Sequence, residues 1–197
     1  YSDEVAVANE TYGPLYSKFA KTPLIELSEN KEANLVGQRL FVNYCAQCHG
    51  SDARGSRGFP NLTDHEWIWG GSPENIKTSI ADGRNAAMAA WESVLTPLQI
   101  GYLADHLMSL TGRKHKATDA QRGKALFANY CAACHQADAT GNPLLGAPNL
   151  ADKIWLYGAS RNKIIESISK GRTGHMPAHK AFLGEDKVHI LAAYVYS

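Results

Sequence analysis

The sequence predicts an all-α fold built from two tandem copies of one helical module. Residues 37–45 resemble residues 123–131. The later segments of the first copy resemble segments of the second copy that lie 88 positions further along the chain. Apolar residues within each copy follow helical spacing, as Ile76 and Ile80 do. Each copy also holds one Cys-x-x-Cys-His motif. These three observations set the fold class and its two-part organisation.

Each module is expected to contain three main helices, in the same order. The first begins near Gly37 or Gly123 and delivers the cysteines, and loops rich in glycine and proline follow it. A middle helix and a final helix complete the module. We expect the middle helices at 72–82 and 160–170, and the final helices at 99–110 and 186–196.

Packing inside each module is expected to join its first and last helices. Phe41 is expected to contact Leu103, and Phe127 to contact Leu191, each pair lying within one repeat. Gly37 and Gly123 would permit close helix approach. The domain ranges that follow are a helical lead-in or connector at 1–36, a first domain at 37–112 and a second at 113–197, with a polar basic linker at 112–121.

Composition sets further bounds. The chain has 197 residues, 44% of them hydrophobic, and a net charge of +1. Residues 1–112 hold 8 Lys and Arg against 13 Asp and Glu, whereas residues 113–197 hold 12 against 6. We therefore expect the two halves to face different partners, and no nucleic acid among them. No apolar run is long enough to span a bilayer and the chain begins at Tyr1, so we expect a mature protein or soluble fragment.

The two Cys-x-x-Cys-His motifs use all four cysteines of the chain. This pattern is typical of covalent haem c attachment, in which Cys45 and Cys48, or Cys131 and Cys134, would bind the porphyrin. Two disulfides would not explain the histidine after each pair. A zinc ribbon needs its cysteine pairs roughly 15–20 residues apart, much closer than here. The motifs therefore predict two haem c groups.

Iron ligands follow from the repeat. His49 and His135, directly after each second cysteine, are the predicted proximal ligands. Their outward ring nitrogens need acceptors, for which the carbonyls of Pro60 and Pro148 are candidates.

The sixth ligands are predicted to be two methionines. Met88 and Met176 occupy equivalent repeat positions, whereas Met108 lies within a final helix and suits core packing. Ala89 stands where the second copy has Pro177, so the loop carrying Met88 is expected to be less constrained.

Haem propionates are expected to meet residues that recur in both copies. Arg84 and Arg172 precede the methionine loops, and a guanidinium matches a carboxylate in geometry. Trp67 and Trp155 could donate their indole N–H to propionates or simply pack as walls.

With these motifs in place, each module resembles a class I cytochrome c domain. The whole chain is similar to the CcoP (FixP) dihaem subunits of cbb3-type cytochrome c oxidases, through segments 58–64, 67–71, 146–150, 154–158 and 183–197. The resemblance covers essentially the full chain.

That resemblance implies two His/Met haems that relay electrons from a soluble donor cytochrome to the haem-copper core, without catalysis by the chain itself. It implies catalytic and monohaem cytochrome partners, a location at the periplasmic face of the bacterial inner membrane, and a membrane anchor that this chain lacks. A free dihaem shuttle and a dihaem peroxidase are the alternatives, and equivalent methionines in both copies argue against the peroxidase.

Overall fold

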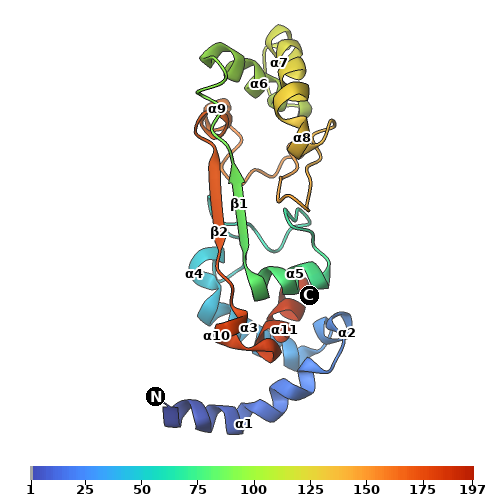
Figure 1. The fold of residues 1–197 in the computed structure, drawn as a ribbon. Coiled ribbons are helices and arrows are strands. Elements are labelled where there is room, and N and C mark those ends of the chain that lie inside the picture. The colour runs from blue at the N-terminus through green and yellow to red at the C-terminus, as the bar shows by residue number, and fades with distance from the viewer. Residues whose placement is uncertain (1) are drawn as a thin grey trace.

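The computed structural model describes residues 2–197, apart from the side chains of residues 2–6, 8 and 9. The predicted all-helical class is confirmed in the main, since helices carry both halves and strands are confined to one short ribbon (Figure 1). The elements in order are α1 (Ser2–Ala20), α2 (Leu24–Ser28), α3 (Lys31–Tyr44), α4 (Ala46–His49), α5 (Pro73–Asp82), β1 (Arg84–Met88), α6 (Pro97–Leu110), α7 (Ala117–Tyr130), α8 (Ala132–His135), α9 (Arg161–Lys170), β2 (Arg172–Met176), α10 (Lys180–Leu183) and α11 (Glu185–Tyr196).

Side-chain caps explain where several helices begin. The Ser72 hydroxyl accepts from Asn75 N at 3.2 Å to start α5, and Ser160 does the same for α9. Thr96 and Gln99 form a capping box at α6. The middle and final helices therefore lie within two residues of their predicted bounds.

The first helix of each repeat begins earlier than predicted. The helix expected near Gly37 begins at Lys31, where the Asn30 side chain accepts from Ala33 N at 3.0 Å. Its counterpart α7 begins at Ala117 instead of near Gly123, with Asp119 in its first turn. The irregular connection between the repeats is correspondingly shorter than the expected 112–121.

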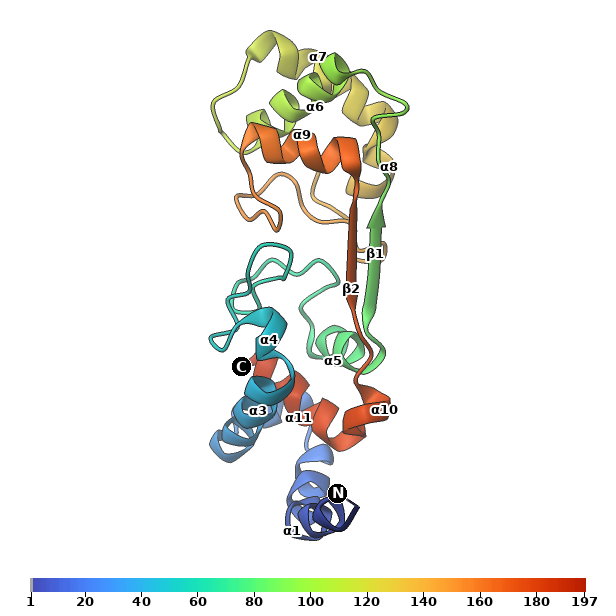
Figure 2. The same cartoon turned by 90° about the vertical axis from the view of Figure 1, so that its left-hand side faces the viewer.

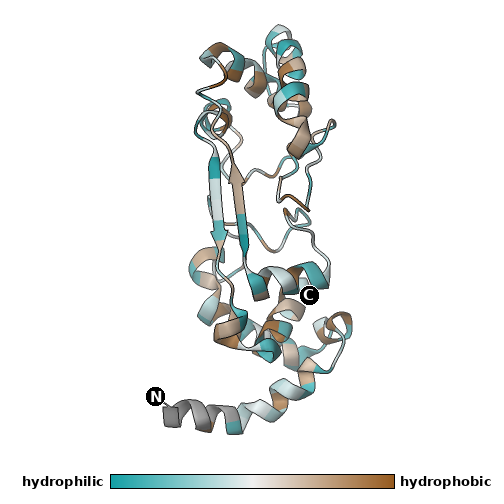
Figure 3. Ribbon diagram, viewed as in Figure 1, coloured by the Kyte–Doolittle hydropathy of each residue, from teal (hydrophilic) through white to brown (hydrophobic). Residues whose placement is uncertain are grey.

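Two five-residue strands, which the sequence reading missed, join the repeats. β1 and β2 pair antiparallel, with Arg84 opposite Met176, Ala86 opposite Gly174 and Met88 opposite Arg172. In Figure 3 the arginine ends of the two strands are hydrophilic and lie at opposite ends of this ribbon. The ribbon thus crosses from one lobe of the molecule to the other.

The crossing exchanges the final helices of the two repeats. α6 packs chiefly on α7 and also on α9, whereas α11 packs on α3 and α5 (Figure 2). We call residues 2–86 with 174–197 lobe A, and residues 87–173 lobe B, dividing the ribbon at its Ala86–Gly174 pair. Lobe B is continuous in sequence and is inserted into lobe A.

The exchange corrects the expected helix packing. Phe41 lies in the same buried cluster as Leu191 and not with Leu103, and its ring is 5.7 Å from that of Tyr194. Phe127 lies with Leu103 and contacts the His106 ring at a centroid distance of 5.5 Å. Each haem-motif helix therefore packs against the final helix of the other repeat. The two repeats are so similar in sequence that either final helix could pack against either haem-motif helix, so the hydrophobic pattern alone could not identify the partner.

Close helix approach at Gly37 and Gly123 is confirmed, across the exchanged pairs. A Cβ added at Gly37 would meet the Cβ of Tyr194 on α11. A Cβ at Gly123 would meet the carbonyl of Tyr102 on α6, and would lie 2.8 Å from the Cβ of His106. Both positions need a residue without a side chain.

The lead-in packs on the rest of lobe A. Phe19 of α1 and Leu27 of α2 are fully buried in the lobe A cluster, which also holds residues of α11. The backbone carbonyl of Thr22 accepts a hydrogen bond from His189 Nε2 at 2.8 Å. Within the described residues, no helix is both long and apolar enough to cross a membrane.

An ion pair with a buried carboxylate fixes α6 inside lobe B. Asp105, 1% exposed, accepts from Arg161 Nη2 at 2.7 Å and from Lys116 N at 3.1 Å. The other lobe has no equivalent pair, because the position that matches Arg161 holds Pro73 and the position that matches Asp105 holds Ala193. Removing Arg161 would leave the buried Asp105 carboxylate without a countercharge, so the pair commits α6 to lobe B.

Gly123→Ala tests the packing of α6 on α7. Helix propensity alone would stabilise the variant by about 1 kcal/mol, whereas overpacking against Tyr102 should destabilise it by about 1–3 kcal/mol. Denaturant unfolding followed by far-UV circular dichroism measures the sign. A free energy of unfolding raised by about 1 kcal/mol, as helix propensity alone would give, would show that the helices do not approach as described.

Candidate haem sites

Each Cys-x-x-Cys-His motif forms a one-turn helix directly after a long helix. Cys45 ends α3 and His49 ends α4, and Cys131 and His135 do the same for α7 and α8. The two pairs lie in different lobes, which separates them too far for one zinc site (Figure 1). Burial, with the neighbouring cysteine, raises the pKa of Cys45 and of Cys131 to about 11. Zinc needs thiolates, so this apolar setting suits neutral thioethers better.

Both predicted proximal histidines are buried and held in one orientation. His49 Nδ1 lies 3.0 Å from the carbonyl of Pro60, and His135 Nδ1 lies 2.9 Å from the carbonyl of Pro148. A carbonyl can only accept, so Nδ1 carries the proton and Nε2 keeps its lone pair. Burial also lowers the pKa of both imidazoles. A neutral ring with a fixed free Nε2 is the form that binds iron.

Matched turns hold the two prolines in place. Leu62 N donates to the carbonyl of Ala53 at 2.8 Å, and Leu150 N donates to that of Ala139 at the same distance. Asn61 Oδ1 accepts from Thr63 N, while Asn149 Oδ1 accepts from Ala151 N, both at 2.9 Å. The two Pro-Asn-Leu turns are therefore the same structure, built to aim one carbonyl at one imidazole.

Arg84 lies beside recurring residues that the sequence reading only partly identified. Its guanidinium carbon lies 4.9 Å from the Trp69 ring centre, and its Nε donates to Ser79 Oγ at 2.9 Å. The serine was missed, although the repeat offset pairs Ser79 with Ser167. No carboxylate in the described part of the chain pairs with Arg84.

Arg172 repeats this arrangement with one addition. It lies 4.6 Å from the Tyr157 ring centre and donates to Ser167 Oγ at 2.9 Å, but it also contacts Glu166 at 3.0 Å. Lys163 and Arg172 together lower the pKa of Glu166 to about 2. The positive charge of Arg172 is thus already partly balanced, so of the two arginines Arg84 is the better candidate for a propionate.

The two predicted tryptophans differ in their hydrogen bonding. Trp155 Nε1 donates to the backbone carbonyl of Asp152 at 3.1 Å. This indole N–H is the group that was predicted to donate to a haem propionate, and it already has a partner. Trp67 is half-buried against the lobe A cluster and packs closely on Gly71. Wall packing is the better description of Trp155, and Trp67 keeps both possibilities.

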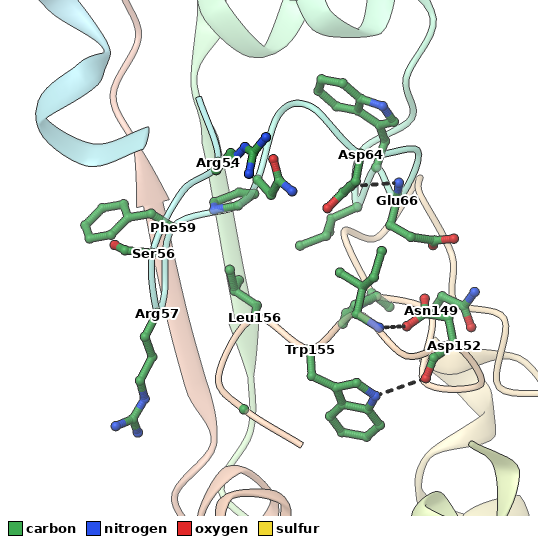
Figure 4. Close-up of a pocket in the computed structure, with 18 of the residues that line it drawn as sticks. Arg54, Ser56, Arg57, Phe59, Asp64, Glu66, Asn149, Asp152, Trp155 and Leu156 are labelled. Carbon is green, nitrogen blue, oxygen red and sulfur yellow. Dashed lines mark hydrogen bonds between the residues drawn. The ribbon is translucent and has the colours of Figure 1, made fainter. Parts of the chain in front are cut away.

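A cavity of about 470 Å³ separates the two sites. In Figure 4, Asp64 and Glu66 from lobe A lie on one side and Asp152 from lobe B on the other, whereas the Phe59 ring points away from them. The lobes touch beside it, where Gly58 N donates to the carbonyl of Leu156 at 3.0 Å. The proline and tryptophan predicted in each site also line this cavity, so the cavity lies next to both sites.

Acidic groups meet across this cavity. Burial raises the pKa of Asp152, and the nearby carboxylates of Glu66 and Asp64 raise it further. The hydrogen bond from Ile154 N acts in the opposite direction and lowers this pKa, which comes to about 6. The three carboxylates come from two lobes, so the sequence could not bring them together.

The predicted sixth ligands sit near the motif of the opposite repeat. Met176 packs on the lobe A cluster with Cys45 and Trp67, whereas Met88 packs on the lobe B cluster with Cys131 and Trp155. Both methionines are half-buried. Met108 is buried in the lobe B core, as predicted for a packing residue.

The residues present fit haem c. Each lobe brings together two cysteines on one helical turn, a neutral imidazole with an open Nε2 and a thioether. In lobe A the Nδ1 atom of His179 is buried with no hydrogen-bond partner, and this ring is near enough to lower the pKa of His49. Such an orphaned polar atom beside the site is expected where a further group belongs.

Asp152→Asn tests the acidic meeting point between the lobes. A raised folded-state pKa means that stability is lost as pH rises from about 4 to about 6. The amide keeps an oxygen for the Ile154 N–H but cannot ionise, so the thermal midpoint should rise near pH 7 and barely change near pH 4.

Asp138→Asn is the matched control for that experiment. Hydrogen bonds from Thr140 lower the pKa of the exposed Asp138, so its replacement should weaken the fold near pH 7. If Asp152→Asn lowers the midpoint at neutral pH as Asp138→Asn does, the carboxylates do not repel one another.

Comparisons with known proteins identify the family of this chain. The family described as "Cytochrome C oxidase, cbb3-type, subunit III" matches residues 32–107 and 118–195. A CcoP subunit of a cbb3-type oxidase from Rubrivivax gelatinosus is 44% identical over 100% of this chain and 65% of its own length. A FixP subunit from Sinorhizobium medicae is 39% identical over 98% of this chain and 72% of its own length. A CcoP subunit from Cereibacter sphaeroides is 38% identical over 83% and 60%. The chain thus spans about two thirds of the length of these relatives, and it belongs to the family of cbb3-type cytochrome c oxidase subunit III.

Proposed function

We propose that this chain binds two haem c groups and relays electrons from a soluble donor cytochrome toward the core of a cbb3-type oxidase. The observation that carries the proposal is the pair of matched sites on the two sides of one cavity. A single site would suffice for a simple carrier, whereas two facing sites provide an internal path. Family membership supports the oxidase context, and the relatives are named as oxidase subunits.

Each site would hold its haem through its own residues. Thioethers at Cys45 and Cys48, or at Cys131 and Cys134, would fix the porphyrin, and His49 or His135 would bind iron through Nε2. The haems supply the electron-accepting iron. The protein contributes the imidazole orientation, the apolar surroundings and the charges near each haem edge.

Charge supports a difference in role between the lobes. Lobe B carries ten Lys and Arg against six Asp and Glu, a net charge of +4, and lobe A carries ten against thirteen, a net charge of −3. The split is smaller than that between the sequence halves but keeps its direction. Lobe B is therefore proposed to receive an acidic donor cytochrome, since complementary charge steers encounter.

Lobe A is proposed to lie nearer the other oxidase subunits. Its lead-in helix α1 packs on α11, so a membrane anchor joined before α1 would hold lobe A close to the bilayer. In this arrangement the complex stands at the periplasmic face of the bacterial inner membrane, with the catalytic and monohaem cytochrome subunits as partners.

Methionine variants test the relay. Met88→Leu and Met176→Leu should each convert one haem to a high-spin or newly ligated form and lower its potential by about 0.1–0.3 V, within the roughly 0.8 V range that axial ligands set. Met108→Leu keeps a buried apolar side chain of similar size and should leave both potentials unchanged. A spectroelectrochemical titration resolves the two haems.

The same titration tests the peroxidase alternative. A methionine-to-iron charge-transfer band for both oxidised haems supports a relay, whereas one stable high-spin iron in the wild-type protein would favour the peroxidase. Equal effects of all three methionine variants would contradict the proposed ligands.

A further inference from the structure

The ribbon fixes which methionine lies in which lobe. Arg84 is paired with Met176 at one end, and Arg172 with Met88 at the other. Met88 lies four residue steps after Arg84 along an extended strand, a distance of about 13 Å. Met88 is therefore carried away from the lobe of its own repeat's motif, and Met176 is brought into it.

Two glycines hold the methionine backbones at these places. A Cβ on Gly83, which ends α5 with φ +71°, would meet the carbonyl oxygen of Met176. A Cβ on Gly171, which ends α9 with φ +69°, would meet that of Met88. The left-handed backbone and the contact both require glycine. Each methionine thus rests on the middle helix of the other repeat.

Backbone hydrogen bonds continue the exchange beyond each methionine. His179 N donates to the carbonyl of Ile80 on α5, and Trp91 N donates to that of Ile168 on α9, both at 3.0 Å. The Trp91 ring then packs edge-on against Tyr130 with centroids 5.5 Å apart, just before Cys131. Each methionine loop is therefore anchored on both sides of the sulfur.

Side-chain packing agrees with the backbone. The sulfur-bearing side chain of Met176 packs on the cluster that includes Cys45 and Trp67. That of Met88 packs on the cluster that includes Cys131 and Trp155. Neither methionine contributes to the cluster of its own repeat's cysteines.

From these contacts we infer that each haem iron takes its sixth ligand from the other repeat: Met176 binds the haem held by Cys45, Cys48 and His49, and Met88 binds the haem held by Cys131, Cys134 and His135. The inference rests on the proposed His/Met haems and specifies their pairing. Each binding site is incomplete without the ribbon.

The exchange also changes which haem is expected to have the weaker bond between iron and methionine. Ala89, in place of a proline, leaves the Met88 loop freer, and Met88 now belongs to the haem of the second motif. That haem is the one from which imidazole displaces methionine at lower concentration. A tandem arrangement without exchange would place the weaker bond at the haem of the first motif.

Nuclear magnetic resonance on the intact reduced holoprotein tests the pairing with both methionines in place, and the variants serve only to assign signals. The methyl group of a methionine bound to low-spin ferrous haem is shifted far upfield, and Met88→Leu and Met176→Leu assign the two signals. In the wild-type protein the Met88 methyl should show Overhauser effects to the haem whose thioether protons belong to Cys131 and Cys134. The Met176 methyl should show them to the haem of Cys45 and Cys48.

A second pair of variants gives an independent reading. In a Cys131→Ala/Cys134→Ala background, which leaves covalent haem only at the first motif, Met176→Leu should abolish the methionine-to-iron charge-transfer band. Met88→Leu in that background is the matched control and should leave the band in place.

The outcomes separate the two proposals. Upfield methyl signals that link Met88 to Cys45 and Cys48 would overturn the exchange while keeping His/Met ligation. Absence of both upfield signals and of both charge-transfer bands in the wild-type protein would instead overturn the ligands on which the relay rests.

Discussion

The antiparallel pairing of β1 with β2 determines how the rest of the molecule is assembled. A five-residue ladder is a small structure, yet it sits where each repeat passes from its middle helix to its methionine loop. Once the chain crosses there, the final helices must complete the opposite lobes. The buried contacts of Phe41 with the α11 cluster and of Phe127 with the α6 cluster then hold the crossing in place. Neither lobe can complete its core from one repeat alone.

The same crossing joins the two candidate haem sites mechanically. Both methionine loops emerge from one hydrogen-bonded ribbon, and the ribbon is closed at each end by an arginine with an aromatic partner. Displacement of one loop would strain the ladder that positions the other. The imidazole side of each site is independent of the ribbon, because His49 and His135 are fixed by proline carbonyls within their own repeats. Each site therefore combines a local half, the Cys-x-x-Cys-His motif with its proline acceptor, and an exchanged half, the methionine loop of the other repeat.

The local half could be predicted from the sequence, and the exchanged half could not. The Cys-x-x-Cys-His motifs, the proline acceptors and the helix at Pro73–Asp82 depend on residues within about 15 positions of one another, so spacing and capping rules suffice. Exchange joins residues from different repeats, and Leu103 and Leu191 are interchangeable in pattern. The asymmetric pair Asp105–Arg161 does distinguish the arrangements, but it becomes recognisable only when its two helices are already placed together. The carboxylates of Asp64, Glu66 and Asp152 meet for the same reason.

Cleavage of the connection between the repeats tests the interlocked assembly most directly. Lys114 is exposed in the irregular segment between α6 and α7, so a protease recognition sequence inserted beside it can be cut in the folded holoprotein. Each resulting piece contributes helices to both lobes. The account predicts that the cut protein elutes as one species in native size-exclusion chromatography, with both haem spectra intact, and separates only in denaturant. Two pieces that elute apart under native conditions, each with its own methionine-to-iron band, would contradict the exchange.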